Sequence, residues 1–288
     1  MSIVITGATG ELGRLVIADL LAAGVPADGI TAVARNPEKA AGLVEQGVRL
    51  LVADYDQPDT FDGAFQTEDR VLLVSASDVG RRVTQHAVVI DAARAAGVAQ
   101  VAYTSIFDAP NTNFGLAQDH RETEQLILDA GLPYTFLRND WYNEAPGVAG
   151  DLQGTVERGV VANGVSPDAR LASAARADYA AAAAVVLSTE GHLNKAYELS
   201  GDTAWTYPEF AAEVSRQSGK TVVHQFLGRD ENAAMLTSVG IPQPFAEILA
   251  EVDEAISHGA LAGSPGDLSR LIGRPTTPLA DTITATLR

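Results

Sequence analysis

The sequence contains no cysteine, and this absence removes several kinds of chemistry. Without a thiol, the 288-residue chain has no disulfide, no thiolate nucleophile and no cysteine-ligated metal. Its five histidines are scattered rather than spaced as metal ligands, so we expect no metal. It also lacks a run of 18 apolar residues and a signal-peptide pattern at its N-terminus. We therefore expect a cytoplasmic protein that does not bind membranes.

Positive charge is also scarce. The chain has 20 Lys+Arg against 37 Asp+Glu, which gives a formal net charge of −17. Such an acidic balance argues against nucleic acid or an anionic membrane surface as a partner. Hydrophobic residues make up 46% of the chain, which is ample for a large core. The length suits one large α/β domain, with or without a smaller lobe.

The most informative stretch that is present covers the first 35 residues. Residues 3–6 are typical of a short buried strand, a glycine turn follows at once, and an apolar-periodic helix comes next. In a dinucleotide site, Gly7 permits the tight turn, Gly10 lets backbone approach a pyrophosphate, and Gly13 lets the helix pack closely. The spacing is GxxGxxG rather than GxGxxG, and an ordinary glycine-rich turn is the alternative interpretation. The predicted phosphate-binding residues are Gly7, Ala8, Thr9, Gly10, Glu11, Leu12 and Gly13.

Arg35 indicates which dinucleotide is bound. It ends the second predicted strand, residues 30–34, and lies 22 residues after Gly13. An acidic residue here would bind the ribose hydroxyl of NAD, whereas arginine accommodates the 2′-phosphate of NADP. A solvated surface arginine is the alternative. The sequence favours NADP(H) as the cofactor.

Strand and helix patterns alternate over the first 140 residues, which predicts a doubly wound parallel sheet, an α/β Rossmann fold. The helical patterns end at glycines, namely Gly24, Gly47, Gly97 and Gly131. The predicted strands cover residues 3–6, 30–34, 49–53, 71–75, 101–104 and 134–137. We assign residues 1–150 to an NADP-binding Rossmann domain.

The pattern changes after residue 138. We assign residues 151–288 to a smaller, helix-rich lobe on the substrate side, with strands and helices that return to the Rossmann sheet. Short strands are expected at 160–162, 171–174, 196–199 and 222–226. Helices are expected at 178–187, 207–218, near 230–239 and 244–257, and at 278–287. Residues 258–267 are the best candidate for a mobile loop.

The catalytic pair of ordinary short-chain dehydrogenases is missing. None of the seven tyrosines has a lysine four residues later, and the chain has three lysines in all. Reduction of a ketone benefits from a positioned acid. Hydride transfer to a strongly oxidising acceptor can leave protonation to solvent, so that catalysis consists of holding the nicotinamide against the acceptor.

Several motifs together resemble the NmrA-like atypical short-chain dehydrogenases/reductases, in particular the bacterial NADPH:quinone oxidoreductases of type 2 and the triphenylmethane reductases. The resemblance covers essentially the whole chain. The motifs that carry it are TGATGELG at 6–13, RNP at 35–37, ADY at 53–55, AYTS at 102–105, YTFLRNDWY at 134–142, RADY at 176–179 and LIG at 271–273.

This resemblance implies further site residues. Asp54 would accept a hydrogen bond from the adenine amino group, and Ser75, Ala76 and Ser77 would line the ribose and nicotinamide side. The segment that follows the sixth strand would face the nicotinamide and the acceptor, together with the surroundings of Ala174. Asp140 stands where the family pattern leads us to expect glycine, which affects the shape of the acceptor pocket. The residues of that segment are Asn139, Asp140, Trp141, Tyr142, Asn143 and Glu144.

Three other groups are candidates for contact with the acceptor. His120 lies where the missing tyrosine and lysine would be, and its imidazole could donate to an acceptor oxygen. The alternative is a structural histidine bonded to Glu124. Trp141 and Tyr142 could stack on a planar acceptor or belong to the core. Ser105 ends a strand where short-chain enzymes place a catalytic serine, although its usual partners are missing.

We therefore expect an NADPH-dependent reductase of quinones or similar conjugated, electron-poor acceptors, with a small aromatic molecule as partner. Reduction of a triphenylmethane dye is the same chemistry in a different pocket. The alternative from another class is a redox sensor that binds NADP(H) without turnover, as some NmrA-like proteins are thought to do. A homodimer is left open by the sequence.

Overall fold

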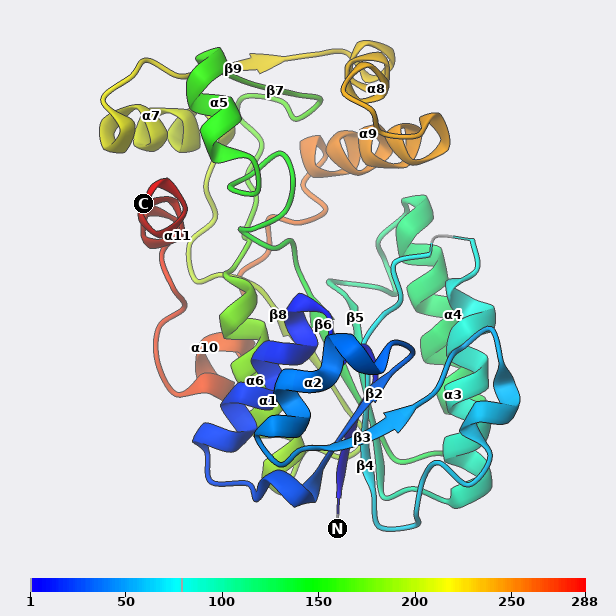
Figure 1. The fold of residues 1–288 in the computed structure, drawn as a ribbon. Coiled ribbons are helices and arrows are strands. Elements are labelled where there is room, and N and C mark those ends of the chain that lie inside the picture. The colour runs from blue at the N-terminus through cyan, green and yellow to red at the C-terminus, as the bar shows by residue number, and fades with distance from the viewer. Residues whose placement is uncertain (1, 79) are drawn as a thin grey trace. The chain divides into compact units, whose positions relative to one another are not determined.

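A computed structural model describes residues 2–78 and 80–288 of the chain. In this part of the chain, seven strands form one sheet in the order β3-β2-β1-β4-β5-β6-β8 (Figure 1). The strands are β1 (Ile3–Ile5), β2 (Ile30–Ala34), β3 (Arg49–Val52), β4 (Arg70–Leu73), β5 (Gln100–Ile106), β6 (Tyr134–Asn139) and β8 (Lys195–Leu199). The first six pair in parallel. This strand order is that of a doubly wound, Rossmann-like sheet, so the predicted fold class is confirmed.

Helices cover both faces of this sheet. Helices α1 (Glu11–Ala22) and α6 (Arg176–Ser188) lie on one side, and α3 (Arg82–Ala96) and α4 (Gly115–Asp129) lie on the other (Figure 1). Helix α2 (Pro37–Glu45) connects β2 to β3. Strands β1, β4 and β5 are almost entirely buried, as expected for a parallel sheet covered on both faces. Val4, Val71 and Tyr103 pack with Ile90 and Ile127 of the covering helices in one apolar core.

The predicted helix ends are confirmed. Gly24, Gly47, Gly97 and Gly131 each follow a helix and adopt positive φ angles between 63° and 88°. Gly97 is the left-handed cap of α3, and its N–H donates to the Ala93 and Arg94 carbonyls. An L side chain at this conformation would be strained, which explains why glycine stops the helices at these points.

The remaining elements form a second group. Strands β7 (Val160–Asn163) and β9 (Val223–Phe226) pair in parallel as a small separate sheet. Helix α7 (Tyr207–Ser218) begins at a capping box in which Thr206 and Glu209 bond to each other's backbone N–H. The other helices are α5 (Leu152–Arg158), α8 (Arg229–Ser238), α9 (Gln243–Ser257), α10 (Asp267–Ile272) and α11 (Leu279–Leu287).

The chain divides into two compact units, and each is made of several segments. The first unit contains Met1–Ala109, Asp119–Asn139 and Ala177–Tyr197, and the second contains Pro110–Gln118, Asp140–Arg176 and Glu198–Arg288. The boundary predicted at residue 150 lies inside a segment of the second unit. The assignment of residues 1–150 to the cofactor and 151–288 to the substrate stays a prediction.

Two details differ from the predicted elements. Residues 171–174 were expected to form a strand, but in the described part of the chain they contribute only isolated bridges, Tyr142 to Ala174 and Leu171 to Trp205. Helices α5 and α10 were not predicted, because both are short and carry little periodic signal. Within residues 2–78 and 80–288, no helix is both long enough and apolar enough to span a bilayer.

Candidate functional site

A cavity of about 420 Å³ lies in the first unit, at the ends of β1, β2 and β4, and we call it the glycine-turn cavity. The ends of parallel strands at the point where the strand order reverses are the usual ligand site of such sheets. The residues that line it are Gly7, Thr9, Gly10, Val33, Ala34, Arg35, Ala53, Asp54, Tyr55, Val74, Ser75, Ala76, Ser77, Asp78 and Gln85. The structure therefore brings together four parts of the predicted site that are far apart in the sequence.

The glycine turn has the geometry that an anion site requires. Gly7 adopts a φ of +59°, and Gly10 N–H donates to the Gly7 carbonyl over 2.9 Å. A Cβ at Gly13 would lie 2.5 Å from the Gly7 carbonyl oxygen, so only glycine lets α1 approach the turn this closely. Gly10 is the N-cap of α1 and supplies no capping side chain. The first N–H groups of α1 are thus left without a side-chain cap, which is the arrangement that binds phosphates.

The other predicted turn residues do not line the cavity. Ala8, Leu12 and Gly13 are buried beneath the turn, and Glu11 is exposed at the start of α1. The three buried residues therefore pack against the turn, and Glu11 faces solvent beside it. Their predicted contact with a cofactor stays a prediction.

Arg35 supplies a positive charge to the cavity. It directly follows β2, and its side chain is exposed. None of the residues that the structure describes forms a hydrogen bond or an ion pair with it. Across the cavity lining, the side chain of Asp54 accepts the N–H of Asp56 over 3.1 Å, while Asp54 N–H donates to Thr60 Oγ1. A free guanidinium on a cavity wall can donate two parallel hydrogen bonds to a phosphate.

Residues 75–77 form the opposite wall. Ser75 N–H donates to Thr104 Oγ1 of β5 over 2.8 Å, which orients this segment as it leaves β4. The Ser75 hydroxyl is buried and has no hydrogen-bond partner among the described residues. A buried polar atom without a partner costs free energy unless a ligand satisfies it.

Sequence analysis did not predict several lining residues, of which Tyr55, Asp78 and Gln85 are polar. Gln85 Nε2 lies 3.2 Å from Asp78 Oδ2 and 3.4 Å from Asp56 Oδ1, so it connects the loops that follow β4 and β3. Tyr55 directly follows Asp54, and extending the predicted loop by one residue would have included it. Gln85 carries no local sequence signal, because its role depends on how α3 packs.

The segment after β6 belongs to both units. Asn139 ends β6 in the first unit, and residues 140–144 lie in the second. Tyr142 pairs with Ala174 in a parallel bridge, in which Ala174 N–H donates to the Trp141 carbonyl and Asn143 N–H donates to the Ala174 carbonyl. The structure thus places Ala174 beside this segment. Trp141 and Tyr142 are half-buried.

The side chains of Asn143 and Glu144 make contacts within the second unit. Asn143 is fully buried, accepts from Ser173 Oγ over 2.6 Å and donates to Thr282 Oγ1 over 3.2 Å. The Glu144 carboxylate accepts Arg176 N–H at the start of α6. The Arg176 guanidinium lies 5.1 Å from the centre of the Tyr142 ring. These contacts fix the conformation of residues 142–144.

Asp140, which stands where glycine was expected, is a buried carboxyl. Its Oδ1 accepts Trp141 N–H over 2.6 Å, whereas its Oδ2 has no hydrogen-bond partner in the described part of the chain. Burial raises the pKa of this carboxyl well above its usual range, which favours the neutral acid.

His120 has a different partner from the one that local spacing suggested. Its Nδ1 is hydrogen-bonded to Tyr103 OH over 2.8 Å, and not to Glu124. Burial, with the Arg82 cation and His86 nearby, lowers the pKa of His120 well below its usual value. The imidazole is thus neutral at physiological pH. Its suggested contact with an acceptor stays a prediction.

Glu124 is instead part of a buried group at the ends of β5 and β6. Ser105 Oγ donates to Glu124 Oε1 over 2.6 Å, and Arg138 donates to both carboxylate oxygens over 2.9 and 2.7 Å. The Ser105 hydroxyl thus donates to a carboxylate that is paired with arginine. A nucleophilic serine needs a base that is free to take its proton, and this carboxylate is already engaged by the arginine, so the geometry gives no support for Ser105 as a nucleophile.

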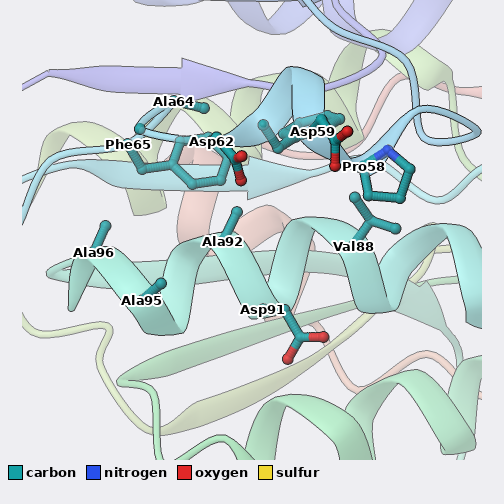
Figure 2. A pocket seen from close by; sticks show the side chains of 12 residues that line it. Pro58, Asp59, Asp62, Ala64, Phe65, Val88, Asp91, Ala92, Ala95 and Ala96 are labelled. Atoms are coloured by element: carbon teal, nitrogen blue, oxygen red, sulfur yellow. The ribbon is translucent and has the colours of Figure 1, made fainter.

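A second cavity, of about 520 Å³, opens between residues 58–65 and α3. Figure 2 shows Pro58, Asp59 and Asp62 on one side and Val88 and Ala92 of α3 on the other. Its walls are mostly apolar, and it contains none of the predicted site residues. Within the described ranges, no cluster of His, Asp or Glu is arranged to hold a metal ion.

The chain is similar in sequence and in structure to known NAD(P)H-binding oxidoreductases. Residues 7–190 match the family model described as NAD(P)H-binding. The chain is 47% identical over 281 residues to quinone oxidoreductase 2 of Escherichia coli (strain K12), with 98% of this chain and 97% of that protein aligned. The crystal structure of an NADPH-dependent quinone oxidoreductase from E. coli in complex with NADPH has a TM-score of 0.95 at 46% identity, covering 99% of this chain and 100% of that one.

A second solved structure is also similar over the whole chain. Triphenylmethane reductase of Citrobacter sp., complexed with NADP(H), has a TM-score of 0.92 at 40% identity. The match covers 99% of this chain and 100% of that chain. Both relatives therefore share the complete fold with the chain and not only its first unit.

Proposed function

This chain belongs to the NmrA-like family of NAD(P)H-binding oxidoreductases, and from that premise we propose that it transfers hydride from NADPH to a quinone or a similar conjugated, electron-poor acceptor. The observation that carries the proposal is the glycine-turn cavity, which combines an anion-binding helix start with the free Arg35 guanidinium. The relatives named as a quinone oxidoreductase and a triphenylmethane reductase support the same class of reaction.

The residues present fit an NADP dinucleotide. Because Gly13 has no Cβ, α1 packs directly against the Gly7 carbonyl and begins beside the turn, and the buried Ser75 hydroxyl has no partner in the described part of the chain. Gly7, Thr9 and Gly10 would hold the pyrophosphate, and Arg35 would pair with the 2′-phosphate. Asp54 would accept from the adenine amino group. When bound, NADPH supplies the hydride, and the protein supplies position and surroundings.

We propose roles for two sets of residues, 75–77 after β4 and 139–144 after β6. Ser75, Ala76 and Ser77 would line the ribose and nicotinamide side, and residues 139–144 with Ala174 would face the nicotinamide and the acceptor. Trp141 and Tyr142 are half-buried, which suits stacking on a planar acceptor. These roles rest on the family resemblance and on the strand ends at which the residues lie.

The protein needs no strong acid of its own for this reaction. The Tyr-x-x-x-Lys pair is missing from the sequence, and His120 is held neutral by burial. A reduced quinone or dye can take its proton from solvent, so the chain acts mainly by orienting the two reactants. This division of roles predicts a weak dependence of kcat on pH near neutrality.

The first test is NADPH oxidation, followed by nicotinamide absorbance, with benzoquinone, a naphthoquinone, a triphenylmethane dye or no acceptor. NADH is assayed in parallel. We expect turnover that depends on the acceptor and prefers NADPH, and the panel then ranks quinone against dye. Tight NADPH binding without turnover on any acceptor would contradict the reductase and favour the redox sensor.

We also propose that the protein works in the cytoplasm and leave its oligomeric state to experiment. A cysteine-free chain is compatible with a reducing compartment. A homodimer is the simplest assembly for such enzymes. Light scattering after size-exclusion chromatography distinguishes a 30.1 kDa monomer from a dimer.

A further inference from the structure

Residues 75–77 leave the sheet with backbone groups that the sheet no longer satisfies. Strand β4 ends at Leu73, so the peptides of residues 75–77 lie beyond the strand ladder. Peptide groups that lie in a buried wall need hydrogen-bond partners or lose free energy. Three side chains from neighbouring elements supply those partners, and all three are buried.

The peptide groups on both sides of Ala76 are hydrogen-bonded to side chains of α3. Ala76 N–H donates to His86 Nε2 over 2.9 Å, and the Ala76 carbonyl accepts Arg82 Nε–H over 2.7 Å. One residue earlier, Ser75 N–H donates to Thr104 Oγ1 over 2.8 Å. His86 and Arg82 come from α3, and Thr104 comes from β5. The orientation of this wall of the glycine-turn cavity is thus fixed from two elements.

The hydrogen bonds of His86 require a single neutral tautomer. Nε2 accepts from Ala76, so Nδ1 carries the proton and donates to Thr123 Oγ1 over 3.0 Å. Thr123 Oγ1 in turn donates to the Asp119 carbonyl over 2.8 Å. Burial and the neighbouring Arg82 cation lower the pKa of His86 to about 3. The acceptor for Ala76 N–H therefore persists over the whole physiological pH range.

Arg82 is a costly residue to bury, and its contacts show what it does there. Its side chain is 7% exposed, and its guanidinium lies 3.3 Å from Asp119. A buried cation is destabilising unless it is paired and hydrogen-bonded. Besides that pairing, Arg82 donates to the carbonyl of Ala76. Helix α3 thus carries two buried polar side chains that bond to the two peptide groups flanking Ala76 in the cavity wall.

We propose that His86, with Arg82 and Thr104, is a positioning residue that fixes residues 75–77 for the nicotinamide half of NADPH. The inference rests on the proposed function, because that function places residues 75–77 against the ribose and nicotinamide. His86 itself touches no reacting atom. It acts through the Ala76 peptide, so its effect is on cofactor affinity and orientation.

Two conservative variants separate the two hydrogen bonds of His86. In His86→Gln, the side-chain oxygen reaches the position of Nε2 and keeps an acceptor for Ala76 N–H. In His86→Asn, the amide reaches only the position of Nδ1, so the bond to Thr123 is kept and the bond to Ala76 is lost. We expect His86→Asn to raise the Kd for NADPH about tenfold and His86→Gln to change it less than about threefold.

Binding of a cofactor fragment shows which half of NADPH the His86 variants weaken. Adenosine 2′,5′-bisphosphate carries the adenine half alone, so its Kd is expected to be unchanged in both His86 variants. Val89→Ala, in the same helix but directed at the core, is the matched control. It is expected to lower the melting temperature and to leave both Kd values unchanged.

The proposal is overturned if His86→Asn and His86→Gln bind NADPH equally well, or if NADPH and the bisphosphate weaken together. Thr104→Val, which is nearly isosteric and removes the Ser75 bond from β5, tests the same wall should His86→Asn fail to fold. It is expected to raise the Kd for NADPH severalfold, and an unchanged Kd would contradict the proposal. Failure of the wild-type protein to bind NADPH would instead refute the proposed function.

Discussion

Arg35 carries a charge that the described residues do not neutralise. Most other arginines of the structure pair with a carboxylate or donate to backbone carbonyls, as Arg138 and Arg70 do. A guanidinium kept free on a cavity wall, in a chain of net charge −17, has the character of a ligand-binding group. Its proposed partner is the 2′-phosphate.

Replacement of this side chain tests that partner. Arg35→Ala is expected to raise the KM for NADPH by at least about tenfold, because a charge-assisted pair with phosphate is lost. The KM for NADH, which lacks the 2′-phosphate, is expected to stay within about twofold. Steady-state kinetics with both cofactors measure the difference. Arg94→Ala removes an exposed arginine outside the cavity and is the control. Equal losses with NADPH and NADH would contradict the role of Arg35.

At the residue scale, the sequence predicted backbone features better than side-chain partners. The glycines could be placed in a turn, and Arg35 at the end of a strand, because both are local features of the sequence. The partner of His120 could not, because Tyr103 is 17 residues away and meets it only when α4 packs on β5. The bonds of Asn143 to Ser173 and Thr282 depend on segments up to 139 residues away, for which one sequence carries no signal.

Among the elements, α1 depends most directly on one glycine. The close contact of Gly13 with the Gly7 carbonyl and with Ala8 Cα, 2.8 Å from an added Cβ, sets how near the helix lies to the turn. Gly13→Ala is therefore expected to reduce the free energy of unfolding by about 1–3 kcal/mol. Thermal or urea denaturation followed by circular dichroism measures this.

Gly42 provides the matched control for this prediction. It lies inside α2, and an added Cβ would meet nothing within 4 Å. Gly42→Ala is expected to be neutral or to stabilise by up to about 1 kcal/mol, because alanine is the better helix former. If both alanine variants had the same effect, the close approach of α1 to the turn would not be the cause.

Asp253 gives α9 a pH-dependent contact with its neighbours. Its Oδ2 accepts Gly164 N–H over 3.0 Å and Asn232 Nδ2–H over 2.8 Å, and burial raises its pKa to about 6 from 3.8. Tyr207 is also near, but burial raises its pKa and it stays neutral. The folded state therefore binds the proton more tightly than the unfolded chain does.

The sign of the resulting pH dependence follows from linkage. The contribution of Asp253 to stability is greatest below pH 3.8, falls as pH rises through about 6, and then levels off at a loss of about 2–3 kcal/mol. Asp253→Asn should remove this dependence, so the difference in unfolding free energy between wild type and variant should change between pH 4 and 7. Urea denaturation at several pH values measures it. A difference that does not vary with pH would show that Asp253 has an ordinary pKa.

At the element scale, the sequence predicted the strands of the sheet because their apolar runs and glycine stops are local signals. The stretch 171–174 has a similar composition but finds only single bridges, since its neighbours in space are Trp205 and Tyr142 rather than another strand. Helices α5 and α10, of seven and six residues, are too short to show a helical period. Their existence depends on packing within the second unit.

For the molecule as a whole, the lack of cysteine has a chemical consequence. Quinones add readily to thiols, and the chain offers none, with only three lysines as amine side chains. We expect exposure to benzoquinone at neutral pH to leave the intact mass and the activity nearly unchanged, since lysine amines are protonated there. Intact-mass spectrometry measures adducts directly.

A variant with one thiol is the control for this expectation. Ser238→Cys places a thiol at an exposed position at the end of α8. It should gain one quinone adduct under the same conditions. If the wild-type chain reacted as fast as this variant, the absence of thiols would not protect it.

The path of the chain between its two units has a consequence for engineering. Each unit is assembled from three separate stretches, so a hybrid with a relative made by a single crossover at residue 150 would join mismatched halves within one unit. To transfer the second unit intact between two family members, Pro110–Gln118, Asp140–Arg176 and Glu198–Arg288 would have to move together. Recombination in this family is thus expected to succeed by the transfer of several matched segments, and not by the swapping of a terminal half.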